Sequence, residues 1–152
     1  MPLRPATVAD APAIVDLLRK APTAAQWSEA QLLQILFDRS TSRFCMVMEE
    51  RGIMQAFLAA RCVVGECELE NIVVDAAVQR KGIGGQLVAA LLECARARQI
   101  ASIFLEVRAS NSAARLLYEK FGFEVASRRP QYYRNPPEDA VIYRFRLCES
   151  AS

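Results

Sequence analysis

The feature that most constrains the fold is a unit of strand, glycine-rich loop, helix and strand between residues 66 and 108. The loop QRKGIGGQL follows the apolar run NIVV, and a helix with apolar residues at Ile83, Leu87 and Leu91 begins within it. The apolar run SIFLEVR comes directly after that helix. A crossover of this length predicts two parallel strands joined by a right-handed connection, which indicates an α/β fold.

Caps, turns and apolar spacing mark the elements on either side of this unit. A Ser or Thr followed three residues later by an acidic or amide residue predicts a capping box, as in Thr7 with Asp10 and Ser28 with Gln31. The expected elements are helices at 7–20 and from 28, three strands of an antiparallel meander within 43–74, a helix at 83–98, a strand at 102–108, a helix at 112–121 and a strand at 141–147. The order α-α-β-β-β-α-β-α-β predicts one α/β domain over 1–152, with a mixed, mostly antiparallel sheet and helices on both faces.

The composition narrows the chemistry that is available. Histidine is absent, so acid–base chemistry has to come from carboxylates, Tyr, Cys or Lys, and no metal site is expected. Nineteen basic and 17 acidic residues give a net charge of +2, too small to indicate direct nucleic-acid binding. The five cysteines form no CxxC pair and no leader precedes them, which predicts reduced, mostly buried thiols and a cytoplasmic location. No apolar run is long enough to cross a membrane.

The glycine loop is a candidate anion site. It lacks the Gly-Lys-Ser/Thr ending of a Walker A loop, and its spacing is not that of a dinucleotide fingerprint. Its glycines still allow close backbone approach, and unpaired N–H groups at a helix start attract phosphates. The candidate residues are Arg80, Lys81, Gly82, Ile83, Gly84 and Gly85. An ordinary glycine-rich turn is an equally good interpretation of the loop alone.

Several motifs in this order resemble one known family. Gln79-x-x-Gly82-x-Gly84 after NIVVDAAV, followed by LEVRASNSAARLLYEKFGF, resembles the GNAT-fold acetyltransferases, which bind acetyl coenzyme A. The segments WSEAQL and YYRNPPEDA narrow the resemblance to the ribosomal-protein-alanine N-acetyltransferases of the RimI type. The chain differs from the family pattern at Gln26, which precedes the Trp of WSEAQL where a Pro is common.

The resemblance implies roles for particular residues. The backbone of Ile72, Val73 and Val74 would pair with the pantetheine arm of acetyl-CoA, and the amides of residues 80–85 would cradle its pyrophosphate. Asn111 would hydrogen-bond the cofactor near its thiol. Glu106 would be the general base, and Tyr118 the general acid for the departing thiolate.

Glu106 is the residue most in need of an explanation, because it interrupts an apolar strand. An ionised carboxylate buried among apolar side chains costs several kcal/mol, roughly, unless it is paired or reaches water. Burial would also raise the pKa of such a carboxyl toward the range that a base near neutrality needs. The alternative is a structural Glu paired with Arg108 or Arg61. Tyr118 has a structural alternative too, as a core aromatic residue with its hydroxyl at the surface.

Residues that could meet an acceptor are spread along the chain. Glu68 and Glu70 alternate onto one face of a strand, where they could assist the base, bind a positive charge or form a solvated edge. Tyr132 and Tyr133 lie in a basic, proline-rich segment at 127–139, which we interpret as an acceptor-binding loop; RNA stacking and a plain surface loop are the alternatives. Trp27 is expected either to wall an acceptor groove or to join the first two helices.

The resemblance implies transfer of an acetyl group from acetyl-CoA to a protein N-terminal amine. In its most specific form, the acceptor is the N-terminal alanine of a small-subunit ribosomal protein. The alternatives are a GNAT enzyme for another amine, such as a lysine side chain, a polyamine or a small molecule, and a non-catalytic coenzyme A-binding module.

Overall fold

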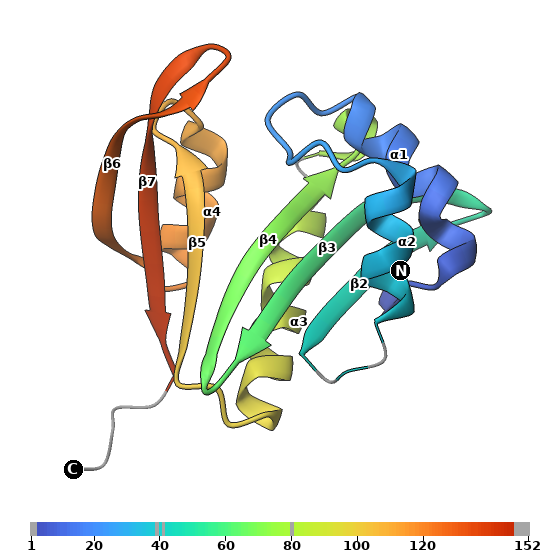
Figure 1. Ribbon diagram of the computed structural model, residues 1–152, viewed down its shortest axis with the longest axis horizontal. Helices are drawn as coiled ribbons and strands as arrows, with labels where there is room; N and C mark the ends of the chain where they lie inside the picture. The colour runs from blue at the N-terminus through green and yellow to red at the C-terminus, as the bar shows by residue number, and fades with distance from the viewer. Residues whose placement is uncertain (1–2, 39, 41, 80, 148–152) are drawn as a thin grey trace. The chain divides into compact units, whose positions relative to one another are not determined.

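The structure is a computed structural model that describes residues 3–38, 40, 42–79 and 81–147 (Figure 1). Its elements are β1 (Leu3–Pro5), the 3₁₀ helix η1 (Val8–Asp10), α1 (Ala11–Arg19), α2 (Glu29–Phe37), β2 (Arg43–Glu50), β3 (Ile53–Val63), β4 (Glu66–Val74), the 3₁₀ helix η2 (Ala76–Val78), α3 (Ile83–Ala97), β5 (Ser102–Arg108), α4 (Ser112–Lys120), β6 (Glu124–Arg134) and β7 (Pro137–Arg146). Every helix and strand expected from the sequence is present, and both capping boxes are confirmed.

The strands form one mixed sheet in the order β1-β2-β3-β4-β5-β7-β6. The β1–β2, β2–β3, β5–β7 and β6–β7 pairs are antiparallel, whereas β4 and β5 are parallel. The crossover through α3 therefore joins parallel strands, as the sequence predicted.

Two strands were not expected. β1 has only three residues, too few for a periodic pattern. β6 has exposed side chains at almost every position, so it lacks the alternation by which a strand is recognised. The prediction of a loop at 127–139 was therefore wrong, because most of this segment lies in β6 and in the start of β7.

By its internal contacts the chain divides into two compact units. The first comprises the residues up to 62 together with 70–87, and the second comprises 63–69 together with the residues from 88 onward.

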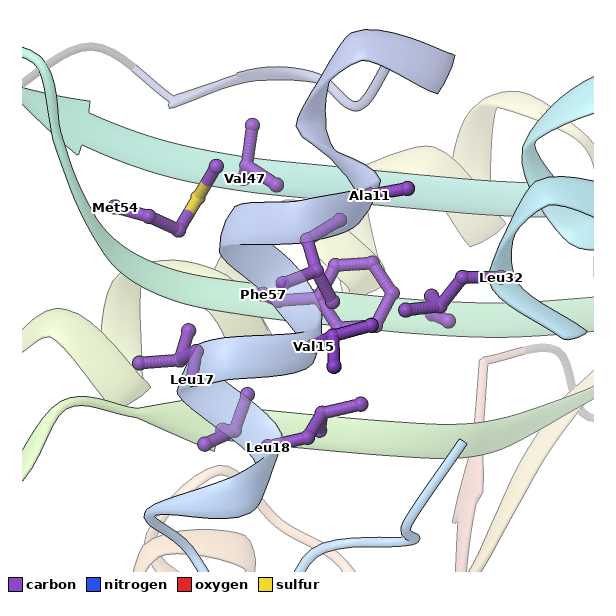
Figure 2. Packing of buried hydrophobic residues seen from close by; sticks show 11 residues of the cluster. Ala11, Val15, Leu17, Leu18, Leu32, Val47, Met54 and Phe57 are labelled. Carbon is purple, nitrogen blue, oxygen red and sulfur yellow. The ribbon is translucent and has the colours of Figure 1, made fainter. Parts of the chain in front are cut away.

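The core of the first unit lies between its two N-terminal helices and its strands (Figure 2). Ile14 from α1, Leu32 from α2 and Phe57 from β3 are fully buried at its centre. Burying each such side chain contributes about 1.5–3 kcal/mol. The cluster consists of Ala11, Ile14, Val15, Leu17, Leu18, Leu32, Val47, Met54, Phe57, Ala59 and Val73.

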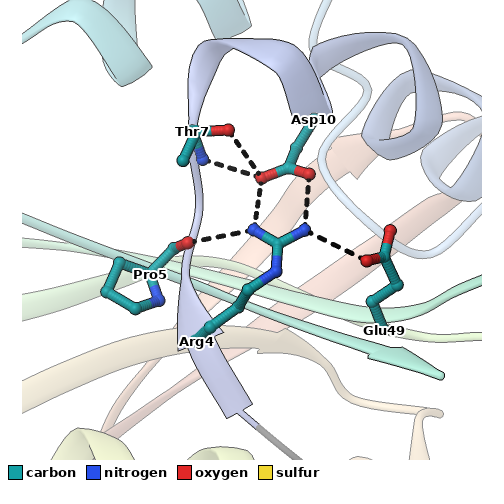
Figure 3. Close-up of polar contacts among 5 residues, drawn as sticks. All are labelled: Arg4, Pro5, Thr7, Asp10 and Glu49. Atoms are coloured by element: carbon teal, nitrogen blue, oxygen red, sulfur yellow. Dashed lines mark hydrogen bonds and ion pairs between the residues drawn. The ribbon is translucent and has the colours of Figure 1, made fainter. Parts of the chain in front are cut away.

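A polar network fastens the N-terminal strand to the first helix of this unit (Figure 3). The Arg4 guanidinium donates two hydrogen bonds of 2.8 Å to the two carboxylate oxygens of Asp10. The Thr7 backbone N–H donates to the same carboxylate at 2.7 Å, and Arg4 also lies 3.5 Å from Glu49. Asp10 is only 7% exposed, and the hydrogen bonds from Arg4 lower the pKa of its carboxyl.

In the second unit, α4 packs on β7 and is held there by a buried phenol. Tyr143 is fully buried, and its hydroxyl donates to Glu119 at 2.5 Å and accepts from Arg115 Nε at 2.9 Å. Arg115 also donates to the backbone oxygen of Ala109 at 2.9 Å. Both ends of α4 are thereby tied to the sheet.

The cysteines depart from expectation in one respect. Cys62 and Cys67 are disulfide-bonded, whereas the sequence predicted reduced thiols, because an odd number of cysteines without CxxC gives no sign of pairing. Cys45 and Cys94 are free, and burial raises the pKa of the Cys45 thiol to about 11. Among the described residues, no helix is both long and apolar enough to cross a membrane.

Candidate active site

The glycine loop at the start of α3 has the geometry of an anion cradle. Gly82 has φ of +78°, a conformation that favours glycine, and an added Cβ there would meet no atom within 4 Å. Gly82 O accepts from Gln86 N at 3.1 Å, so the N–H groups of the first turn of this 15-residue helix begin directly after the glycine. The first N–H groups of a helix have no intrahelical partner and can bind an anion, so this turn is compatible with the predicted pyrophosphate site, which stays a prediction. Lys81 is exposed beside it, and Arg80 lies outside the described residues.

The strand before this loop pairs with β5 along only part of its length. The parallel pairing with β5 covers Glu66 to Leu69, and β4 then continues to Val74. Val73 points into the core at 5% exposure, while Ile72 and Val74 are half-buried. Gln79 Nε2 donates to Val74 O at 3.2 Å and so fixes the strand end to the loop. The backbone at residues 72–74 therefore suits pairing with an extended ligand, as the family resemblance implies.

The loop at 20–28, between α1 and α2, is held by two amide side chains for which the sequence predicted no contact. Gln26 Nε2 donates to the carbonyls of Leu18, Ala21 and Ala24 at 2.8, 2.9 and 3.1 Å. Asn71 of β4 is 4% exposed, and its Nδ2 donates to Ala25 O at 2.9 Å. The Gln26 contacts are local, whereas the Asn71 contact joins residues 46 positions apart, for which sequence patterns give no signal.

Trp27 lies in the same loop and meets Phe57 of β3 edge-on, with ring centroids 6.2 Å apart. It is partly buried against the core cluster of the first unit. The contact fits the interpretation that Trp27 joins the first two helices. An additional role in walling an acceptor groove stays a prediction.

The two candidate carboxylates of β4, Glu68 and Glu70, differ in their surroundings. Glu70 is half-buried and ion-paired to Arg43, which also lies 3.7 Å from Asp38. Glu68 is exposed and lies opposite Phe104 in the parallel register. Because Phe104 and Glu106 share one face of β5, Glu68 is on the face that carries Glu106. Of the two, Glu68 is the better candidate for meeting a cationic acceptor.

Glu106 is not surrounded by apolar side chains. Its neighbours Leu105 and Val107 point into the core, whereas the Glu106 side chain is 28% exposed. Its carboxylate lies 3.7 Å from the Arg129 guanidinium of β6. The alternative pairing with Arg108 or Arg61 was wrong for Arg108, which pairs with Glu138 at 3.4 Å. The β5–β7–β6 pairing decides the partner, and the sequence did not reveal that β6 exists.

Two tyrosines of β6 complete the surroundings of Glu106. Hydrogen bonding to the Glu106 carboxylate, followed by its charge, raises the pKa of the Tyr132 hydroxyl. Burial, followed by the charge of Glu106, raises the pKa of Tyr133. The two rings meet edge-on at 5.2 Å, and the Arg108 guanidinium lies 4.2 Å from the centre of the Tyr133 ring. The structure therefore brings the predicted base and the two predicted acceptor tyrosines together.

Tyr118 of α4 is a buried aromatic residue, 4% exposed, that contacts Phe123 and Tyr143 with ring centroids 5.7 and 6.1 Å away. Burial raises the pKa of its hydroxyl well above the usual range, so the phenol keeps its proton at neutral pH. A protonated phenol is compatible with the predicted role of Tyr118 as proton donor, which stays a prediction. Asn111 caps the same helix, because its Oδ1 accepts from Ala114 N at 3.2 Å. Its contact with a cofactor stays a prediction.

In the described part of the chain, no group of three or more His, Cys, Asp or Glu side chains is arranged to hold a metal ion.

Known proteins resemble this chain in sequence and in fold. The model of the acetyltransferase (GNAT) family matches residues 11–123. The [ribosomal protein bS18]-alanine N-acetyltransferase of Escherichia coli K12 is 42% identical over 97 residues, which are 62% of this chain and 66% of that protein, slightly under two thirds. The enzyme of the same name from Haemophilus ducreyi is 34% identical over 119 residues, covering 76% of this chain and 80% of the relative.

Solved structures extend the likeness over the whole chain. The ribosomal-protein-S18-alanine N-acetyltransferase from Escherichia coli superposes with a TM-score of 0.86 and 31% identity, covering 99% of this chain and 96% of that one. A putative acetyltransferase from Salmonella typhimurium, solved with its cofactor acetyl-CoA, shares the fold with a TM-score of 0.86 at 24% identity, covering 100% and 96% of the two chains. This chain belongs to the acetyltransferase (GNAT) family.

Proposed function

We propose that residues 1–152 act as a single acetyl-CoA-dependent N-acetyltransferase domain for protein N-terminal amines. In its most specific form, the acceptor is the N-terminal alanine of a small-subunit ribosomal protein. The observation that carries this proposal is the full-length likeness, at 31% identity, to the ribosomal-protein-S18-alanine N-acetyltransferase of Escherichia coli. A ribosomal protein as acceptor also favours a cytoplasmic location, with no direct contact to nucleic acid or membrane.

The residues fit acetyl-CoA as co-substrate, which supplies an activated acetyl thioester. The N–H groups of the glycine loop, with Lys81 beside them, would hold the pyrophosphate. The backbone of residues 72–74 would pair with the pantetheine arm, and Asn111 would hydrogen-bond near the thiol. A main-chain N–H at Val73 or Val74 would stabilise the negative charge that develops on the thioester oxygen.

The chemistry of the acceptor suits a single carboxylate base. A terminal amine has a pKa of about 7.7–8.0, so deprotonating it at pH 7 costs about 1–1.5 kcal/mol, against about 4.5 kcal/mol for a lysine. Glu106 is half-exposed and already interacts with a cation, so it can accept the amine proton directly or through water. Tyr118 retains its proton and would give it to the departing thiolate. No cysteine nucleophile is needed for direct transfer.

Coenzyme A release by the purified protein tests this proposal. The acceptors are a short peptide that copies an alanine-started ribosomal N-terminus, the same peptide with a blocked N-terminus, and a blocked peptide with an internal lysine. Turnover confined to the free N-terminus is expected. Turnover of the lysine peptide or of small amines alone would reject the N-terminal acceptor, and tight acetyl-CoA binding without turnover of any amine would indicate a non-catalytic module.

A further inference from the structure

The carboxylate of Glu106 is already engaged by a cation of the protein itself. The Arg129 Nη1 lies 3.7 Å from Glu106 Oε1, and the guanidinium carbon lies 5.4 Å from the centre of the Tyr132 ring. The Arg129 side chain is 59% exposed and that of Glu106 is 28% exposed, so this pair is open to solvent. Exposed pairs of this kind are weak and exchange easily.

The backbone of β6 explains why Arg129 lies here. Its register with β7 shifts between Arg129 and Tyr133, and Gln131 within that shift has φ of +51°. Gln131 N donates to Asp139 at 2.9 Å, which holds the irregular segment against β7. An irregularity of this type re-aims the neighbouring side chains, here Arg129 and Tyr132, toward Glu106.

Two arginines near Arg129 form ion pairs with carboxylates other than Glu106. Arg128 pairs with Asp139 at 2.8 Å, and Arg108 pairs with Glu138 at 3.4 Å. Arg129 alternates away from Arg128 along the strand and faces the proposed base instead. Adjacent arginines of one strand therefore provide a matched pair for experiment.

We propose that Arg129 is a specificity-determining residue that occupies, before the acceptor binds, the place at Glu106 that the acceptor's ammonium group takes over. The proposal rests on the proposed role of Glu106 as the base. The guanidinium and an ammonium group carry the same charge and donate the same type of hydrogen bond to a carboxylate. An acceptor that arrives protonated displaces Arg129 at little cost, whereas an uncharged ligand does not compete for the carboxylate.

Glu68 strengthens this exchange. It lies on the same face of the sheet as Glu106, and Arg108 and Arg144 lie on that face too. Arg108 is paired with Glu138, and the exposed Glu68 provides a second carboxylate toward which an incoming ammonium is attracted. The acceptor class that this arrangement selects is a cationic primary amine.

Calorimetry tests the proposal without turnover. The protein is saturated with coenzyme A and titrated with an alanine-started peptide bearing a free N-terminus, and separately with the N-acetylated form of that peptide. Arg129→Gln is expected to bind the free-amine peptide about two- to fivefold more tightly, the scale of an exposed ion pair, and to bind the acetylated peptide as the wild type does. Arg128→Gln and Arg129→Lys serve as controls, and both should bind either peptide as the wild type does.

A double variant ties the effect to the base. In a Glu106→Gln background, the Arg129 substitution should no longer change affinity for the amine, because its partner is gone. If the peptide does not bind, alaninamide is the amine probe for the same comparison. Equal or weaker amine binding by Arg129→Gln, or an equal gain for the acetylated peptide, overturns the proposal. Absence of turnover by the wild-type protein would instead reject the proposed function, and the two failures are distinguishable because the binding comparison is measured without turnover.

Discussion

Two ion pairs in this chain both join an arginine to a carboxylate but differ in geometry and in exposure to solvent. Arg4 and Asp10, in the first unit, form two hydrogen bonds of 2.8 Å, and the carboxylate also accepts from a backbone N–H. Arg129 and Glu106, in the second unit, make a single approach of 3.7 Å between partly exposed side chains. The Asp10 carboxylate is buried and already accepts from Arg4 and Thr7, whereas that of Glu106 is partly exposed and loosely paired.

The difference shows how to separate a carboxylate that stabilises the fold from one that is available for chemistry. Burial and bidentate geometry make removal of Asp10 costly, because its partners would lose their acceptor. Because the Glu106 side chain is partly exposed and its ion pair is loose, neutralising it should change the free energy of unfolding little. Substitutions should therefore affect the two residues in opposite ways.

The largest expected effect is on catalysis by Glu106→Gln. Loss of the base should lower kcat by about 10²- to 10⁴-fold while acetyl-CoA affinity is retained. The free energy of unfolding should change by less than about 0.5 kcal/mol, because the lost pair is exposed. Steady-state kinetics and urea unfolding of the same preparation measure both quantities. A kcat close to that of the wild type would remove Glu106 as the base.

Asp10→Ala is the converse experiment. Removing the buried carboxylate leaves Arg4 and the Thr7 N–H without their partner, and the free energy of unfolding should fall by about 2–4 kcal/mol. The control is Asp16→Ala in the same region, since Asp16 lies 3.9 Å from Arg19 and both side chains are exposed. That control should lose less than about 0.5 kcal/mol in urea unfolding. Similar losses of unfolding free energy for Asp10→Ala and Asp16→Ala would contradict the contrast between a buried and an exposed ion pair.

The pH dependence of stability should follow from the same carboxylate. Hydrogen bonds from Arg4 lower the folded-state pKa of Asp10 below its unfolded value of about 3.9. Its contribution is therefore complete above about pH 5 and is lost as the pH falls through the folded-state pKa. The stability gap between the wild type and Asp10→Asn should shrink steadily between pH 5 and about pH 2. A constant gap over that range would show that Asp10 stabilises by packing and not by charge.

Tyr143→Phe probes a third polar network and should have the smallest effect. The substitution removes the hydroxyl between Glu119 and Arg115 but keeps the buried ring. A loss of about 1–2 kcal/mol in unfolding free energy is expected, because one donor and one acceptor lose their partner. Tyr132→Phe, at a residue that is 45% exposed and whose hydroxyl bonds to the partly exposed Glu106 carboxylate, is the comparison for stability. Equal stability of the two variants would show that Glu119 and Arg115 find other partners.

Local patterns in the sequence were enough to predict most of the fold. The capping boxes at Thr7 and Ser28, and the crossover through α3, depend on residues a few positions apart, and all are confirmed. β6 was missed because an edge strand with exposed side chains has no apolar period. Motifs that resemble those of a known family also indicated Glu106 and Tyr118 as candidate site residues, and their roles stay predictions.

What surrounds the candidate site was not predictable in the same way. The pairing of Glu106 with Arg129 depends on the β5–β7–β6 order, which is a tertiary property. The amide contacts of Gln26 and Asn71 depend on loop carbonyls brought near by folding. Sequence periodicity does not predict such contacts, because it indicates which side chains are buried and not which groups they contact.

Gln26 has a consequence for how this chain can change over generations. One amide nitrogen of Gln26 holds three carbonyls of the chain between residues 18 and 24. A single base change at the Gln26 codon can therefore remove all three contacts at once. The path of the loop at 20–28 thus depends on one side chain and not on the covalent restriction that a proline would impose.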